Sequence, residues 1–180
     1  VFDEFKEAVE LFQQVSYDIM HVEEKQFDED FFRFRNSVKE LDRRLATILA
    51  NAFDDLNSIP SRTKLFDNFE GLLERTILQD ELERRYTALL VQYKEDLREV
   101  QDLFTENKQK VEANADDAPI NSNMPPVTGA IYWANALRLR VENPMVKVKA
   151  YAEAVREVPE EFKEVEKLYR TLKAALGEYE

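Results

Sequence analysis

The chain has 180 residues, of which 44% are hydrophobic, so it can bury a sizeable core. Its 37 acidic and 25 basic side chains leave a net charge of −12, which repels phosphate backbones and anionic lipids and excludes nucleic acid and membrane surfaces as expected partners. It has no cysteine and only three glycines, which excludes a disulfide framework and indicates long helices.

The first predicted helix runs from Phe2 to about Glu24, because apolar residues recur there every three or four positions. A second helix starts near Asp28 and reaches about Asn57. Its apolar seam alternates steps of three and four, as in helices that pack side by side: Phe31, Phe34, Val38, Leu41, Leu45, Ile48 and Ala52. Leu49, Phe53 and Leu56 widen this stripe.

A turn at Pro60 precedes a short helix, and the longest helix is then predicted from Ile77 to about Val111. Its seam is Leu82, Tyr86, Leu89, Tyr93, Leu97, Val100 and Phe104. At 1.5 Å per residue this helix extends roughly 50 Å. A compact chain of this length would be about 40 Å across, so we expect an elongated molecule.

Four prolines organise the C-terminal part. Pro125 and Pro126 fix two successive φ angles, so that a polar linker stops and a helix starts with the stripe Val127, Ile131, Ala134, Leu137 and Val141. Asn143 and Pro144 have the pattern of a second helix start. Pro159, followed by two glutamates, has the pattern of a third, and the helix that starts there is predicted to end near Gly177. We therefore predict an all-α fold of elongated helical bundles with about seven helices and no sheet. We divide it into a long-helix bundle (1–113), a linker (114–126) and a second bundle (127–180).

Three blocks of the sequence resemble the N-terminal tail, or stem, of axonemal dynein heavy chains, and they occur in the same order. They are FDEDFFRFRNSVKELDRRLATILANAFDDL (27–56), LFDNFEGLLERTILQDELERRYTALLVQYKEDLREVQDLF (65–104) and NMPPVTGAIYWANALRLRVENPM (123–145). Together they hold 93 of the 180 residues, spread between Phe27 and Met145. The resemblance implies a segment of a longer protein, built of successive helical bundles.

The resemblance also implies partners and a location. The partners would be dynein intermediate chains, light chains and other heavy chains in a dynein arm of a cilium or flagellum axoneme. ATP hydrolysis would belong to a distant motor ring, and a phosphate-binding GxxxxGK loop does not fit this sequence, whose glycines are Gly71, Gly129 and Gly177. We expect no cofactor in this segment and, because microtubules are acidic, no direct microtubule binding.

No residue pattern indicates catalysis or a metal site. His21 is the sole histidine, too few for a zinc or di-iron site, and adjacent acids such as Glu160 and Glu161 are expected as helix-surface charges. The adjacent arginines at 43–44 and 84–85 have acidic helical neighbours, so we expect ion pairs within a helix.

The candidate residues are structural or interfacial ones. Pro125 and Pro126 set the angle of a helix, and Trp133 lies off the main stripe, where it packs within the chain or contacts a partner. Phe31 and Phe32 are adjacent, so they cannot both face one neighbour.

The leading hypothesis is a non-enzymatic scaffold segment of a dynein tail. The alternatives are a free-standing helical adaptor or homodimeric coiled coil, with the seams of residues 31–52 and 82–104 as its interface, and a helical-bundle enzyme.

Overall fold

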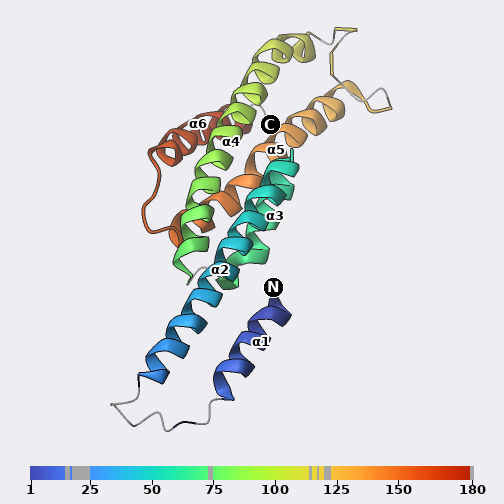
Figure 1. The fold of residues 1–180 in the computed structure, drawn as a ribbon. Coiled ribbons are helices and arrows are strands. Elements are labelled where there is room, and N and C mark those ends of the chain that lie inside the picture. The colour runs from blue at the N-terminus through green and yellow to red at the C-terminus, as the bar shows by residue number, and fades with distance from the viewer. Residues whose placement is uncertain are drawn as a thin grey trace.

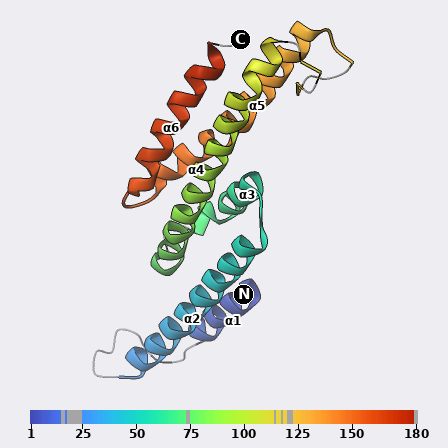
Figure 2. The ribbon, with the colours of Figure 1, turned by 90° about the horizontal axis from the view of Figure 1, so that it is seen from above.

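The computed structural model describes residues 1–14, 17, 25–72, 75–113, 115, 116, 118, 119 and 123–178. These residues form helices and no strand, which confirms the all-α prediction. The helices are α1 (Phe2–Gln13), α2 (Gln26–Asp55), α3 (Ile59–Phe69), α4 (Thr76–Glu112), α5 (Pro126–Ala154) and α6 (Glu160–Gly177), with a short 3₁₀ helix at Glu70–Leu72. The molecule is elongated, with α1 and the start of α2 at one end and the α4–α5 connection at the other (Figures 1 and 2).

The longest helix, α4, is the centre of the packing. Its 37 residues correspond to about 55 Å, and α2, α3, α5 and α6 all pack against it. All seven residues of its predicted seam are buried: Leu82, Tyr86, Leu89, Tyr93, Leu97, Val100 and Phe104. The prediction for this helix is confirmed in its extent and in its buried face.

The N-terminal helix α1 is shorter than predicted. It ends at Gln13, and Gln14 caps it through its backbone N–H, which donates to the carbonyl of Glu10. The later positions of the predicted stripe, Val15, Ile19 and Val22, lie outside the described residues, as does His21. In the described part, α1 packs along α2.

Helix α2 changes its buried face along its length. Leu41, Leu49 and Phe53 are buried, whereas Ile48 of the predicted seam is half exposed. A straight α-helix has 3.6 residues per turn and drifts about 20° per heptad from a strict seven-residue seam. Leu49 and Phe53, which were predicted only to widen the stripe, therefore form the core contact of the C-terminal half of α2.

One continuous helix, α5, occupies the stretch that was predicted as two helices. Pro126 is its first residue, as predicted, and the N–H of Gly129 donates to the carbonyl of Pro125 at 2.8 Å. Pro144 lies inside the helix and is buried, so the prediction of a helix start there is wrong. For the described residues the chain therefore has six α-helices rather than about seven.

Two tyrosines of α4 hold α5 on both sides of Pro144. The hydroxyl of Tyr93 donates to the carbonyl of Val141, and that of Tyr86 donates to the carbonyl of Val148 at 2.8 Å. A proline inside a helix costs about 3 kcal/mol through its missing N–H and its clash with the preceding turn. Burial along this face and the two tyrosine bonds offset that cost. The same burial raises the pKa of both tyrosines, so they stay neutral donors.

Helices on both sides of the predicted linker share one hydrophobic core. Its residues include Leu49 and Phe53 of α2, the α4 seam, Val141 and Val148 of α5, and Val165, Leu172 and Leu176 of α6. The helix α6 begins after Pro159 and ends at Gly177, as predicted. The division into bundles at 1–113 and 127–180 stays a prediction about folding units, but the packing joins both parts through α4.

Candidate docking surfaces

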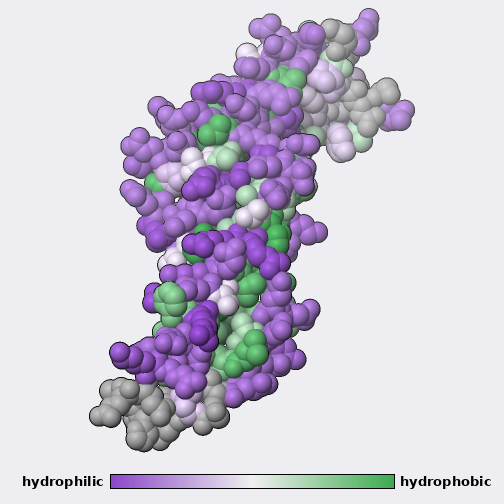
Figure 3. Space-filling view, in the orientation of Figure 1, coloured by the Kyte–Doolittle hydropathy of each residue, from purple (hydrophilic) through white to green (hydrophobic). Residues whose placement is uncertain are grey.

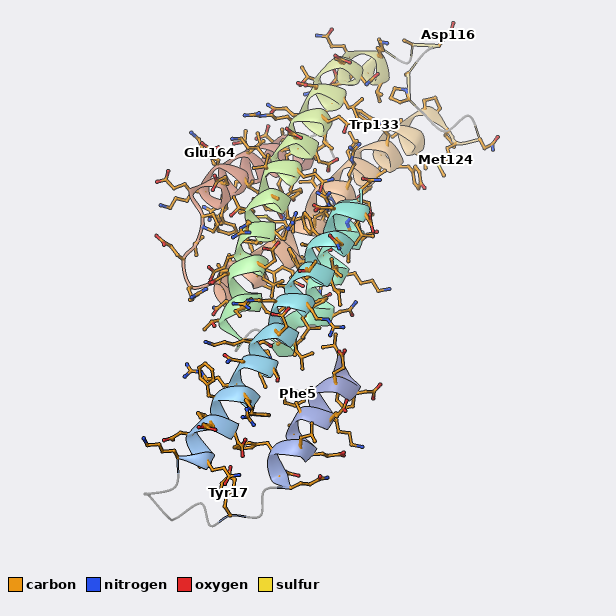
Figure 4. All side chains as sticks on the ribbon, viewed as in Figure 1. Phe5, Tyr17, Asp116, Met124, Trp133 and Glu164 are labelled. Carbon is orange, nitrogen blue, oxygen red and sulfur yellow. The ribbon has the colours of Figure 1, made fainter. Side chains whose placement is uncertain are left out.

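The candidate residues of the sequence lie in two separate regions. Trp133 lies near the α4–α5 connection (Figure 4). Pro125 and Pro126 are exposed at the start of α5. Phe31 and Phe32 lie in the first turns of α2, at the opposite end of the molecule (Figure 1). The structure does not bring the two sets together.

Trp133 packs within the chain. Its ring stacks on Phe104 of α4, with centroids 5.9 Å apart and an angle of 16° between the planes. The ammonium of Lys108 lies 5.8 Å from the centre of the Phe104 ring. The Trp133–Phe104 pair joins the N-terminal part of α5 to the C-terminal part of α4. The helix that starts at the two prolines is therefore packed against α4. A contact of Trp133 with a partner stays a prediction.

An aromatic cluster joins α1 to α2. Phe12 stacks on Phe34 at 4.9 Å, and Phe27 stacks on Phe31 at 5.8 Å. Figure 3 shows a largely hydrophilic face, on which hydrophobic residues are visible where α1 faces α2. Phe32 is 64% exposed. As expected for adjacent residues of a helix, Phe31 and Phe32 thus have different environments.

The paired arginines divide their roles. Arg43 bonds Glu40 and Arg84 bonds Glu81, within their own helices, as predicted. Arg44 instead bonds Glu4 of α1 at 2.8 Å, and it lowers the pKa of that carboxyl. Similarly, Arg85 bonds Asp54 of α2 at 2.6 Å, in addition to Glu81. The second arginine of each pair therefore connects two helices, which helical spacing alone does not reveal.

A polar cluster connects α3 to α5. The ammonium of Lys147 lies 2.8 Å from a carboxylate oxygen of Asp67, and the Tyr151 hydroxyl donates to the same carboxylate. The bond from Lys147 and then that from Tyr151 lower the pKa of Asp67. The Tyr151 ring also packs edge-on against Phe66 at 5.3 Å.

Replacing Asp67 by asparagine should flatten the acid side of the stability profile. Because the pKa of Asp67 is lower in the folded state than its ordinary value of 3.8, the carboxylate stabilises the fold above that pH. This contribution disappears as the pH falls through the lowered pKa. We expect D67N to be less stable than the parent at pH 7 and to lose less stability below about pH 4, measured by urea unfolding at each pH.

The matched control is D55N, which changes an exposed carboxylate at the end of α2. An identical pH profile for D67N and D55N would contradict the role of Asp67.

A second apolar row on α5 is exposed along most of the helix. It has heptad spacing and consists of Tyr132, Ala136, Leu139, Asn143, Val146 and Ala150, all of them exposed. We call this row the α5 seam. The sequence prediction followed one apolar stripe on this helix and did not identify this second row. Val127 and Ile131 of the predicted buried stripe are exposed. The signal was present in the seven-residue spacing of Tyr132, Leu139 and Val146.

A groove of about 740 Å³ lies beside the middle of the α5 seam, between α4, α5 and the start of α3. Ile59, Pro144 and Leu139 supply its apolar lining, and Glu95, Asp96 and Glu99 of α4 are its acids. Arg140 bonds Asp96 and, at 2.6 Å, Glu99. The groove thus combines apolar walls with an excess of negative charge.

Neither a metal centre nor a membrane span is found in the described part. Its His, Cys, Asp and Glu side chains form no group of three or more that could hold a metal ion. None of its helices combines the length and the apolar character needed to cross a bilayer.

The described residues thus form an elongated, all-helical body with exposed apolar helix faces, which places the chain in the class of helical-bundle segments. Residues 1–180 match the family described as "Dynein heavy chain, N-terminal region 1" over their whole length, and the chain belongs to this family. It is therefore part of the N-terminal tail region of a dynein heavy chain and not of the ATPase motor domain.

The relatives carry the names of axonemal dyneins. The chain is 44% identical over 180 residues to the "Dynein beta chain, flagellar outer arm" of Chlamydomonas reinhardtii, covering 99% of this chain and 4% of that protein. It is 34% identical to the "Dynein beta chain, ciliary" of Heliocidaris crassispina and 35% identical to the "Dynein axonemal heavy chain 17" of Mus musculus. Each of these two alignments covers 149 residues, or 83% of this chain and 3% of the relative. The chain thus spans only a few per cent of the length of these relatives.

Proposed function

We propose that the chain is a non-enzymatic structural segment of the tail that scaffolds the assembly of a ciliary or flagellar dynein arm for microtubule-based movement. Its family supports the tail assignment. The relatives named for the flagellar outer arm and for cilia support a location in an axoneme.

The observation that carries the proposal is the combination of one shared core with apolar faces left exposed. The core extends through α2 to α6, so the segment resists bending between its helices. Exposed apolar residues remain at Phe32 of α2 and along the α5 seam. Exposed apolar faces of this kind are typical of protein interaction surfaces.

The proposed partners are dynein intermediate chains, light chains and other heavy chains. A net charge of −12 disfavours nucleic acid, membrane surfaces and the acidic microtubule lattice, so we propose no direct contact with any of them. We also propose that this segment needs no cofactor.

A homodimeric coiled coil is the alternative, and the burial in α4 argues against it. That alternative needs the seam of residues 82–104 to face a second copy. The seam residues are instead buried against helices of the same chain. The seam of residues 31–52 meets α1 over part of its length.

Deleting residues 1–180 from the full-length heavy chain tests the proposal. We expect the purified variant to retain ATP hydrolysis while intermediate chains, light chains or other heavy chains no longer co-purify in stoichiometric amounts. Quantitative mass spectrometry of the purified complex measures this. A full complement of subunits on the deleted chain would contradict the scaffold function.

A further inference from the structure

The α5 seam has the composition of a covered helix face although it is exposed. Tyr132, Leu139 and Val146 are 58%, 51% and 69% exposed. The six seam positions between residues 132 and 150 hold no charged side chain. They extend about 27 Å along the helix, or roughly five turns.

Both long faces of α5 are therefore apolar. The buried face contributes Ala134, Leu137, Val141, Met145 and Val148 to the core. The helix carries six charged residues in 29, whereas α4 carries fifteen in 37. A helix that is apolar on opposite sides is typical of one that is covered on both.

Three charges beside the α5 seam are already paired within the chain. Arg140 bonds Glu99, Lys147 bonds Asp67, and Glu142 bonds Lys173 of α6 at 2.9 Å. The six seam residues themselves are uncharged, so they form a neutral strip along the helix. The adjacent groove differs from the strip in its charge. Its lining includes three acids, Glu95, Asp96 and Glu99, and one cation, Arg140. The excess negative charge beside the strip lies on α4.

We propose that the α5 seam binds a helix of a different polypeptide, which carries an apolar heptad stripe flanked by lysine or arginine. The apolar stripe covers Tyr132, Leu139 and Val146, and the flanking cations meet Glu95 and Glu99 at the groove. Asn143 lies at a seam position between Leu139 and Val146, where one polar residue sets the register of paired helices.

Charge complementarity selects this occupant over a second copy of the chain. Each copy carries a net charge of −12 and would bring the same carboxylates to the interface. Opposed acidic surfaces repel each other and suppress such pairing. A basic amphipathic helix satisfies both the strip and the groove. The inference rests on the proposed scaffold function, because the partner helix belongs to another subunit of the same assembly.

Site-specific photo-crosslinking in the full-length heavy chain, assembled in its native complex, tests the inference. A benzophenone amino acid replaces Leu139 or Val146 in turn, and Val127 as the control, which is exposed on the same helix but off the seam. We expect positions 139 and 146 to crosslink to one helical peptide of another subunit with basic residues beside its apolar stripe. Crosslinks to a second copy of the chain or to an acidic segment would overturn the inference. So would a crosslink yield at positions 139 and 146 no higher than that at the control position.

Charge reversal provides the second arm. In the chain with the crosslinker at 146, E95K with E99K should lower the crosslink yield roughly tenfold or more, whereas K163E, on an exposed position of α6, should leave it unchanged. An unchanged yield in the double variant would refute the basic partner. If the arm still assembles with all its subunits while positions 139 and 146 stay uncrosslinked, the inference fails and the scaffold function stands.

Discussion

Replacing Phe53 by alanine is expected to lower the free energy of unfolding by about 3–5 kcal/mol. The ring is only 2% exposed and stacks on Phe66 of α3 with centroids 5.6 Å apart. The guanidinium of Arg62 lies 4.2 Å from the ring centre, on its face. Truncation removes the transfer free energy of the ring, leaves a cavity and abolishes this cation–π contact. Phe53 thus connects α2 to α3 and to the rest of the core.

The matched control for F53A is F32A, because both phenylalanines belong to α2 and Phe32 is 64% exposed. Urea unfolding followed by far-UV circular dichroism measures both, and F32A should stay within about 0.5 kcal/mol of the parent. Equal losses in the two variants would contradict the assignment of Phe53 to the core.

Replacing Leu97 by alanine is the second large expected effect, a loss of about 2–5 kcal/mol. Leu97 has no exposed surface and lies in the α4 seam, in the cluster that also holds residues of α5 and α6. Proteins of this size have a total stability of about 5–15 kcal/mol, so the loss is a large fraction of the whole. Because α4 contacts the helices on both sides of the predicted linker, the entire fold should be affected.

Two probes show whether L97A weakens the fold as one unit. Fluorescence of Trp133, the sole tryptophan, reports the contact of α5 with α4, and circular dichroism reports all helices. We expect coincident midpoints, both shifted to lower urea. The control L139A, at a position that is half exposed, should change stability by less than about 0.5 kcal/mol. Separated transitions would instead favour two folding units at 1–113 and 127–180.

The sequence analysis was most accurate for α4, for a physical reason. A helix packed on several sides needs apolar residues at every turn, so its periodicity is strong, and all seven seam residues are buried as predicted. In α2 the buried face turns with the helix, so Leu49, which was predicted only to widen the stripe, is fully buried, whereas Ile48 of the predicted heptad seam is half exposed.

The error at Pro144 has a different cause. Asn143 and Pro144 carry the local signal of a helix start, but tertiary contacts decide the outcome. Tyr86 and Tyr93 bond carbonyls on both sides of the proline, and the flanking residues Val141 and Met145 are buried. No local pattern contains the information that hydroxyls from residue positions 86 and 93 reach this helix.

The surfaces were less predictable than the fold. The first turn after Pro125 and Pro126 follows directly from their fixed φ angles. The α5 seam and the groove beside it depend on which side of α5 the other helices cover, and periodicity does not distinguish the covered side of a doubly apolar helix. The family, by contrast, was evident from three blocks that follow one another in a fixed order, and the family match extends over residues 1–180.

A structure of the intact dynein arm that contains this chain tests the scaffold proposal most directly. We expect residues 2–177 to form the same six helices within the tail, with another subunit covering exposed apolar surface such as the α5 seam. A tail in which this segment has no neighbouring subunit within contact distance would contradict it.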